Sequence, residues 1–141
     1  MAVARFDHVA IPAADPEPLL AFYRSLGFSI LYEEEWRAGN GVPAIAVGPD
    51  QKINVHPPAL WQSGEFTLRG PTAQPGSADL CFVWDGSVQE IQSLLELVGA
   101  TIERGPVPMR GGAQGGQGRG TSVYTRDPEQ NLVEFIVYEG D

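Results

Sequence analysis

An internal repeat with a period of 72 residues constrains the fold of this chain more than any other feature. Two helices are predicted, over residues 15–26 and 87–98, each with apolar residues at i, i+3, i+4 and i+7 and a glycine directly after it. Asp15 can cap the first helix, and Ser87 with Glu90 forms a capping-box pattern for the second. Because the caps, apolar faces and stops all match, the chain is expected to contain two copies of one supersecondary unit.

Short apolar runs flank both helices and predict the strands of each copy. One strand precedes each helix and three follow it, so each half is expected to be a βαβββ module. The predicted fold class is α+β, with two tandem modules, each a curled mixed sheet with one helix on its outer side. The modules are expected at residues 1–56 and 78–141, with a linker at 57–77, in one compact domain overall. The predicted strands are 5–11, 28–34, 42–47 and 52–56 in the first half, and 78–84, 100–104, 121–125 and 132–138 in the second.

Composition excludes several classes of partner. Nine basic residues against 18 acidic ones give a net charge of −9, which disfavours nucleic acid and anionic membranes. No apolar run reaches the roughly 18 residues of a membrane span, and the N-terminus lacks the pattern of a signal peptide, so a cytoplasmic protein is expected. Cys81 is the only cysteine, which excludes an intrachain disulfide and a cysteine-cluster metal site.

Four residues with metal-ligand chemistry fall at similar places in the two halves. His8 and Asp79 lie in the first strands of the halves, 71 residues apart, and His56 and Glu134 lie in the last strands. Glu134 is the most informative, because a carboxylate between apolar strand residues is costly unless it is paired, protonated or bound to a metal. The competing interpretations are a structural His8, a Glu134 paired with an arginine such as Arg5 or Arg126, and an Asp79 that caps a turn.

The motifs that carry these residues resemble those of the vicinal oxygen chelate superfamily. These motifs are Phe6-Asp7-His8-Val9-Ala10-Ile11, Phe22-Tyr23-Arg24-Ser25-Leu26-Gly27-Phe28 and the tail from Tyr124 to Phe135 with its Asp-Pro turn and Asn-Leu-Val-Glu. The superfamily includes glyoxalase I, extradiol dioxygenases, fosfomycin-resistance proteins and bleomycin-binding proteins. The chain is most similar to glyoxalase-domain proteins of the "virulence protein" type, through Gln51-Lys52-Ile53-Asn54-Val55-His56 and Gly105-Pro106-Val107-Pro108.

The resemblance implies a metal site and a dimer. The candidate ligands are His8, His56, Asp79 and Glu134, around one divalent ion (Mn, Fe, Ni, Co or Zn), and Asp79 departs from the histidine that is common at its place. Glu134 or Asp79 could move a proton during catalysis. The resemblance implies a homodimer, in which one site can be shared between two subunits.

The expected function is that of a metal-dependent, glyoxalase-like lyase or isomerase acting on a small vicinally oxygenated substrate through a chelated oxyanion or enediolate. A ring-cleaving extradiol dioxygenase with Fe(II), using His8, His56 and Glu134, is one alternative, and a metal-free antibiotic-binding protein is the other. Glyoxalase I holds its glutathione adduct partly with an arginine soon after the first ligand. No arginine follows closely after His8 here, so the resemblance disfavours a glutathione substrate.

The glycine-rich segment 110–120 lacks the Gly-Lys-Ser/Thr ending of a phosphate loop and a helix signal after it. A mobile flap over the site is expected instead. Arg110 and Arg119 are candidates for an anion pocket, although a role in surface solubility is the stronger expectation.

Overall fold

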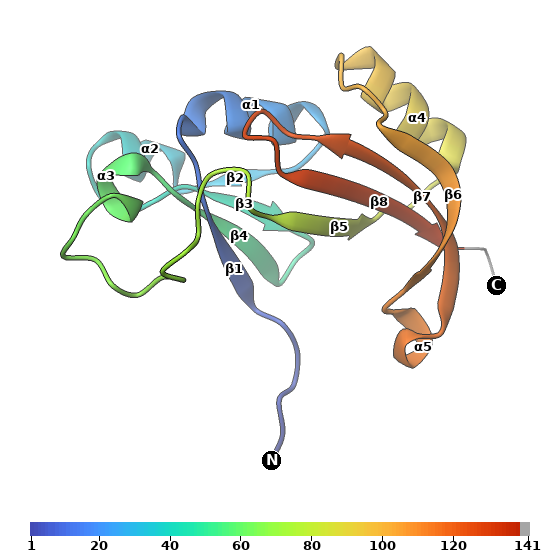
Figure 1. Cartoon of the computed structure of the whole chain (residues 1–141), viewed down its shortest axis with the longest axis horizontal. Helices are drawn as coiled ribbons and strands as arrows, with labels where there is room; N and C mark the ends of the chain where they lie inside the picture. The colour runs from blue at the N-terminus through green and yellow to red at the C-terminus, as the bar shows by residue number, and fades with distance from the viewer. Residues whose placement is uncertain (139–141) are drawn as a thin grey trace. The chain divides into compact units, whose positions relative to one another are not determined.

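The computed structural model describes residues 1–138 and divides into two compact units, Met1–Ser77 and Ala78–Asp141. Residues 139–141, at the end of the second predicted module, lie outside the described part. The segment 57–77, expected to be a linker, falls within the first unit. The units are described separately below, and Figure 1 labels their elements.

The first unit contains a four-stranded mixed sheet in the order β1-β4-β3-β2. Strand β1 is parallel to β4, and the other pairs are antiparallel. Figure 1 shows α1 lying over this sheet. Residues such as Leu19 and Tyr23 of the helix and Ile53 and Val55 of β4 form the core. The elements are β1 (His8–Pro12), α1 (Pro16–Ser25), β2 (Ile30–Leu31), α2 (Glu33–Arg37), β3 (Ala44–Val47), β4 (Gln51–His56) and α3 (Pro58–Trp61).

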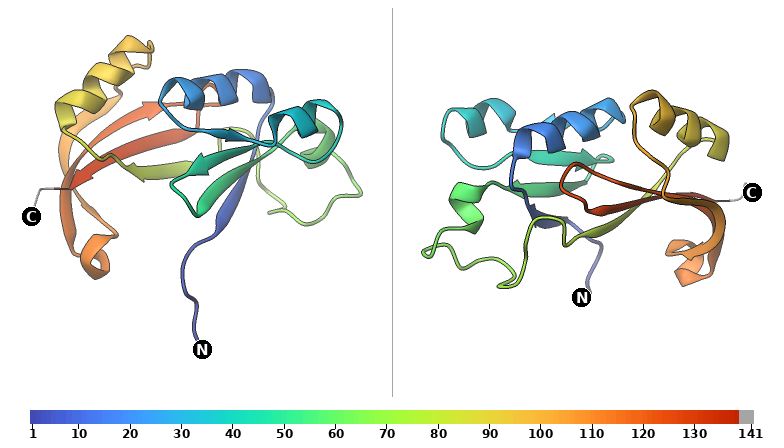
Figure 2. Two further views of the ribbon diagram at one scale, coloured as in Figure 1. Left: turned by 180° about the vertical axis from the view of Figure 1, so that it is seen from behind. Right: turned by 45° about the horizontal axis from the view of Figure 1, so that its top comes forward.

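The second unit repeats this topology with the sheet order β5-β8-β7-β6. Strand β5 is parallel to β8, and the remaining pairs are antiparallel. Helix α4 lies along one face of this sheet (Figure 2) and buries Ile91 and Leu95. The elements are β5 (Asp79–Val83), α4 (Val88–Leu97), β6 (Arg104–Gly111), α5 (Ala113–Gly116), β7 (Gly118–Arg126) and β8 (Leu132–Tyr138).

The predicted α+β fold is confirmed, and neither sheet closes into a barrel. The helix caps are also as predicted. Asp15 accepts a hydrogen bond from Glu17 N, and Ser87 and Glu90 bond reciprocally as a capping box. None of the helices in residues 1–138 has the length and hydropathy needed to cross a membrane.

The predicted strands 5–11 and 121–125 differ from β1 and β7 by up to three residues at an end, and two other predicted strands are wrong in extent. The strand over 28–34 is reduced to β2, because Tyr32 adopts a left-handed conformation (φ 61°) and helix α2 begins directly after it. Three consecutive glutamates occupy the first turn of α2, where the helix dipole favours acidic side chains.

The strand predicted at 100–104 begins only at Arg104 and continues to Gly111 as β6. Both ends of the glycine-rich segment 110–120 are therefore paired backbone, and only residues 112–117 lie outside the strands. In the β6–β7 hairpin, Arg110 lies opposite Arg119 and Gly111 opposite Gly118, with the short α5 between the strands.

Candidate functional site

Each sheet has a face covered by its helix and an open face, and the candidate residues lie on the open faces. In β8, Val133 and Phe135 are buried toward the helix, whereas Glu134 points the other way and is half-buried. In β1, His8 and Ala10 alternate with the more buried Val9 and Ile11. The strand pattern therefore places both His8 and Glu134 on a surface that a small molecule can reach.

Glu134 is surrounded by hydroxyl and thiol donors from the two strands beside β8. Its Cα partners are Cys81 in β5 and Tyr124 in β7, so these side chains share its face. Ser122, also in β7 and fully buried, donates a hydrogen bond from Oγ to Oε2 of Glu134 at 2.6 Å. Arg126, one arginine considered as a partner for Glu134, instead pairs with Glu103.

The Glu134 carboxylate also affects the titration of its neighbours. Desolvation is the largest cause of the raised pKa of Cys81, about 12, followed by the charge of Glu134 and a hydrogen bond to it. The residue as a whole is exposed, but its thiol lies against the sheet beside this carboxylate. The pKa of Tyr124 is raised by desolvation first and then by Glu134. Both groups are therefore protonated donors at neutral pH, not bases.

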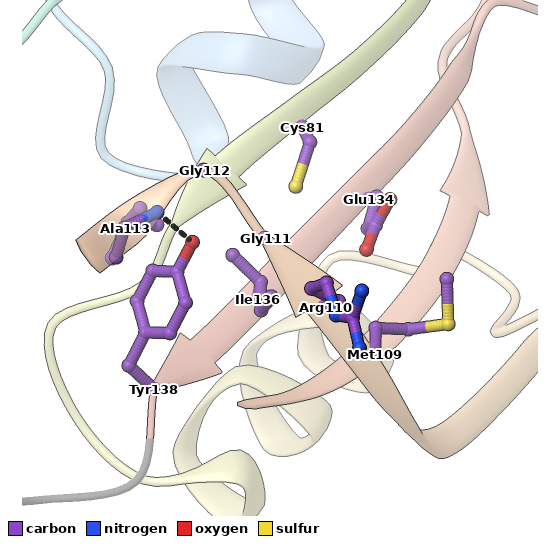
Figure 3. A pocket seen from close by; sticks show the side chains of 10 residues that line it. Cys81, Met109, Arg110, Gly111, Gly112, Ala113, Glu134, Ile136 and Tyr138 are labelled. Carbon is purple, nitrogen blue, oxygen red and sulfur yellow. Dashed lines mark hydrogen bonds between the residues drawn. The ribbon is translucent and has the colours of Figure 1, made fainter. Parts of the chain in front are cut away.

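A cavity of about 460 Å³ opens beside Glu134 within the second unit. Cys81, Glu134 and Arg110 lie around it with the apolar side chains of Met109 and Ile136 (Figure 3). Tyr138 closes one end, where its hydroxyl accepts a hydrogen bond from Ala113 N at 3.2 Å. This volume suits a small organic molecule, with a carboxylate and a guanidinium available to it.

Asp79 lies near Glu134 but not directly beside it. Its Cα partner in β8 is Leu132, two residues before Glu134, so the two carboxylates are diagonal neighbours on one face. Asp79 is exposed at the start of β5.

His8 is held by the carboxylate next to it in the chain. Its Nδ1 lies 2.6 Å from Oδ1 of Asp7, and both residues are exposed. Because an ionised carboxylate only accepts hydrogen bonds, Nδ1 carries the proton of this contact, and Nε2 is the ring nitrogen that Asp7 does not engage. The hydrogen bond to His8 is also the main reason that the pKa of Asp7 is lowered.

His56 occupies a different environment at the far end of β4. Its Cα partner in β1 is Pro12, whereas the Cα partner of His8 is Lys52, so the two histidines are four residues, about 13 Å, apart along the paired strands. The His56 ring is buried and makes an edge-to-face contact with Phe66, with 5.5 Å between ring centroids. Burial, and secondly the charge of Arg69, lower its pKa. The structure therefore does not bring His8 and His56 together within the first unit.

The strand registers also redefine the repeat. His8 corresponds to Asp79, since each begins the parallel pair of its sheet, but Asn54 rather than His56 corresponds to Glu134. The position opposite His8 is taken by the ammonium side chain of Lys52. Lys52 and Asn54 on β4, which share the face of His8, are therefore site residues that the sequence analysis did not single out, as are Ser122 and Tyr124 beside Glu134.

These donors can be compared with the requirements of a divalent metal ion. Within residues 1–138, no three His, Cys, Asp or Glu side chains form a group that could hold an ion. The first unit offers His8 on its open face, and the second offers Asp79 and Glu134. Imidazole and carboxylate suit a divalent ion, and His8 and Glu134 each have a second group, Asp7 and Ser122, that orients them as outer-shell partners do.

Comparison with known proteins places these features in one family. Residues 5–135 match the model of the Glyoxalase/Bleomycin resistance protein/Dioxygenase superfamily. The glyoxalase domain-containing protein RDO1 of Mycosarcoma maydis is 36% identical over 99% of this chain and 71% of its own length. Virulence protein STM3117 of Salmonella typhimurium is 34% identical over 98% of this chain and 87% of its own length.

Solved structures agree on the fold. The crystal structure of STM3117 covers 99% of this chain and 100% of its own with a TM-score of 0.82 and 33% identity. Two more distant structures share the fold alone. One is a lactoylglutathione lyase from Agrobacterium tumefaciens, with a TM-score of 0.68 and 21% identity over 96% of this chain and 95% of its own. The other is the antibiotic binding protein TnmS3 from Streptomyces, with a TM-score of 0.71 and 20% identity over 99% of each chain.

Proposed function

Because this chain belongs to the Glyoxalase/Bleomycin resistance protein/Dioxygenase superfamily, we propose that it is a metal-dependent lyase or isomerase acting on a small vicinally oxygenated substrate. The proposal includes a cytoplasmic homodimer, with a site that can be shared between subunits. The superfamily model and the relatives support the general class. The reaction catalysed, the bound metal ion and the dimeric assembly are what we propose in addition.

The observation that carries the proposal is the setting of Glu134. It is a carboxylate on an open sheet face, beside a cavity of about 460 Å³, held by the hydroxyl of Ser122. A carboxylate fixed in this way can accept a proton from a substrate carbon or oxygen and return it to a neighbouring atom. Cys81 and Tyr124 do not compete as bases, because their raised pKa values keep them protonated.

In the proposed dimer, where one site can be shared between subunits, His8, Asp79 and Glu134 would hold the divalent ion. When bound, the ion would supply Lewis acidity that stabilises negative charge on a substrate oxygen. Asp7 would fix the ring of His8, and Ser122 would fix the carboxylate of Glu134, which leaves Arg110 to contact an anionic part of the substrate. The types of the ligand residues do not determine which of Mn, Fe, Ni, Co and Zn binds.

Metal titration of matched variants tests this proposal. Calorimetry with Mn²⁺, Ni²⁺ and Zn²⁺ is expected to give stoichiometric binding to the wild type and at least tenfold weaker binding to His8→Ala, Asp79→Asn and Glu134→Gln. His56→Ala measures whether the fourth predicted ligand takes part, and with the geometry above it is expected to bind as the wild type does. Circular dichroism confirms that each variant is folded. Wild-type affinity in the folded His8→Ala and Glu134→Gln variants would reject the metal site.

One observation favours a second candidate, a metal-free small-molecule binding protein. Lys52 lies directly opposite His8 and presents a positive charge on the face where a cation would bind. Protein stripped of metal by a chelator separates the candidates, because a binding protein retains its small-molecule ligand and an enzyme loses turnover.

The ring-cleaving dioxygenase receives no such support. It requires two histidines and a carboxylate around one iron, and His8 and His56 lie at opposite ends of β1 and β4. Oxygen uptake on catechol with Fe(II) would nevertheless establish that alternative.

A further inference from the structure

A second cavity, of about 400 Å³, lies wholly within the first unit, and none of the proposed metal ligands lines it. Its floor is formed by Lys52 and Asn54, which share one face of β4. Its walls come from the beginning of α2 and the loop after it, through Tyr32, Glu35 and Asn40. We propose that this cavity binds a small monoanionic carboxylate, recognised by Lys52.

The charge of Lys52 is the first argument. Its Nζ lies 4.8 Å from the centroid of the Tyr32 ring, close enough for a cation–π interaction that stabilises the charged ammonium. Among residues 1–138, no carboxylate forms an ion pair with Lys52, whereas Arg24, Arg37 and Arg126 each pair with a glutamate. Lys52 is half-buried, so an anion that reaches it gains more than it would beside a fully solvated lysine.

The construction of the walls is the second argument. Tyr32 holds its ring beside the ammonium from a left-handed backbone conformation, which costs energy for a non-glycine residue and often marks a functional position. Asn40 is carried by a tight turn in which its backbone N–H donates to Glu35 O at 2.8 Å. Asn40 and Asn54 both line the cavity, and an asparagine amide can supply neutral N–H donors beside the single cation.

The same residues define the charge of the ligand. One ammonium and two amides can neutralise and hydrogen-bond a single carboxylate. Glu35 lines the cavity too, and the chain carries a net charge of −9, so a dianion such as phosphate is repelled. The volume accommodates a carboxylate with an attached ring or short chain.

The experiment is run at pH 8 and uses benzoate as the probe, with benzamide as its neutral isostere and inorganic phosphate, which is mainly the dianion at this pH. Because Lys52 is the only lysine of the chain, reductive ¹³C-methylation gives one side-chain NMR signal that reports directly on this cavity and keeps the charge. Calorimetry on the unmodified full chain, without added metal, provides the affinities. Lys52→Met removes the cation, and Arg119→Met removes one exposed positive charge from the other unit as the control.

Benzoate is expected to shift the Lys52 signal saturably and to bind at least tenfold more tightly than benzamide or phosphate. Binding should weaken at least tenfold in Lys52→Met and change less than twofold in Arg119→Met. Equal affinity for benzoate and benzamide, tighter binding of phosphate, or unchanged affinity in Lys52→Met would each overturn the proposal. If Lys52→Met does not fold, the ratio of the affinities for benzoate and benzamide in the wild type is sufficient to test the proposal. Loss of metal binding in the titrations above leaves this result unaffected, so the two proposals can fail separately.

Discussion

The hydroxyl of Ser122 donates a 2.6 Å hydrogen bond to the Glu134 carboxylate across the β7–β8 pair. Ser122 is fully buried, and its Cα partner in the register is Ile136, so the bond runs diagonally on the open face of the sheet. A hydrogen bond to an ionised group contributes about 1.5–3 kcal/mol. This contact therefore both orients Glu134 and stabilises the second unit.

Replacing Ser122 with alanine is expected to lower the free energy of unfolding by about 1.5–3 kcal/mol, because the carboxylate loses a charge-assisted donor. Urea denaturation measures the change. In the Glu134→Gln background the same substitution should cost less, since no charged acceptor remains, and a double-mutant cycle isolates the coupling. Equal costs in the two backgrounds would show that the loss comes from packing alone.

The thiol of Cys81 is expected to react slowly despite its exposed position. With a pKa of about 12, about one thiol in ten thousand is ionised at pH 8, compared with about one in ten at the ordinary value of 9.0. Iodoacetamide labelling, followed by mass spectrometry between pH 7 and 10, should therefore be far slower in the folded than in the unfolded protein. Glu134→Gln should accelerate labelling, because the charge and hydrogen bond of Glu134 are removed while desolvation remains.

The pH dependence of stability provides the control for this prediction. Since the folded pKa of Cys81 lies above the unfolded value, its contribution is complete below about pH 9 and is lost as pH rises toward 12. Cys81→Ser should flatten this alkaline slope. Labelling of the folded wild type at the rate of the unfolded chain would contradict the raised pKa.

The fold was predictable from the sequence because its signals are local. The capping box of Ser87 and Glu90 forms as expected, with Glu90 N donating to Ser87 Oγ at 3.1 Å, and the apolar helix face needs only a 3.6-residue period. Glu134 could also be identified, because one carboxylate in an apolar strand is unusual wherever that strand lies.

The partners of the site residues could not be predicted, because strand register depends on pairing across the sheet. The repeat shift is 71 residues at His8 but 80 at Asn54, since the second unit has the longer β6–β7 hairpin between its helix and its last strand. The sequence analysis matched His56 with Glu134 because both lie in the last strands of their halves, but the registers show that His56 lies two residues too far along β4. Ser122 gave no signal in the sequence, because only the hairpin register places it near Glu134.

Glycine is expected to be required at position 120 because a side chain does not fit there, not because the backbone must be flexible. A Cβ at this position would lie 2.5 Å from the carbonyl oxygen of Val137, and backbone atoms in a paired strand cannot move aside cheaply. Gly120→Ala should lower the free energy of unfolding by about 1–3 kcal/mol. Gly112, in the same glycine-rich segment, has no atom within 4 Å of its Cβ position, so Gly112→Ala is the matched control and should have little effect. Equal thermal unfolding of the two variants would show that the space around Gly120 does not restrict its side chain.

His56 is expected to make the protein less stable in mild acid. Burial, and secondly the charge of Arg69, hold its folded pKa below the ordinary value of 6.5, so the unfolded chain binds the proton more readily. The stability contributed by the neutral ring is present above about pH 6.5 and is lost as pH falls through the window below it. An NMR titration of the imidazole should give a pKa below 6.5, and Arg69→Met should raise it because a nearby positive charge is removed.

Urea denaturation between pH 7.5 and 5.5 should show a shallower loss of stability in His56→Gln. An ordinary pKa in the folded protein, or an unchanged slope in His56→Gln, would show that the ring is solvated and free to act as a ligand.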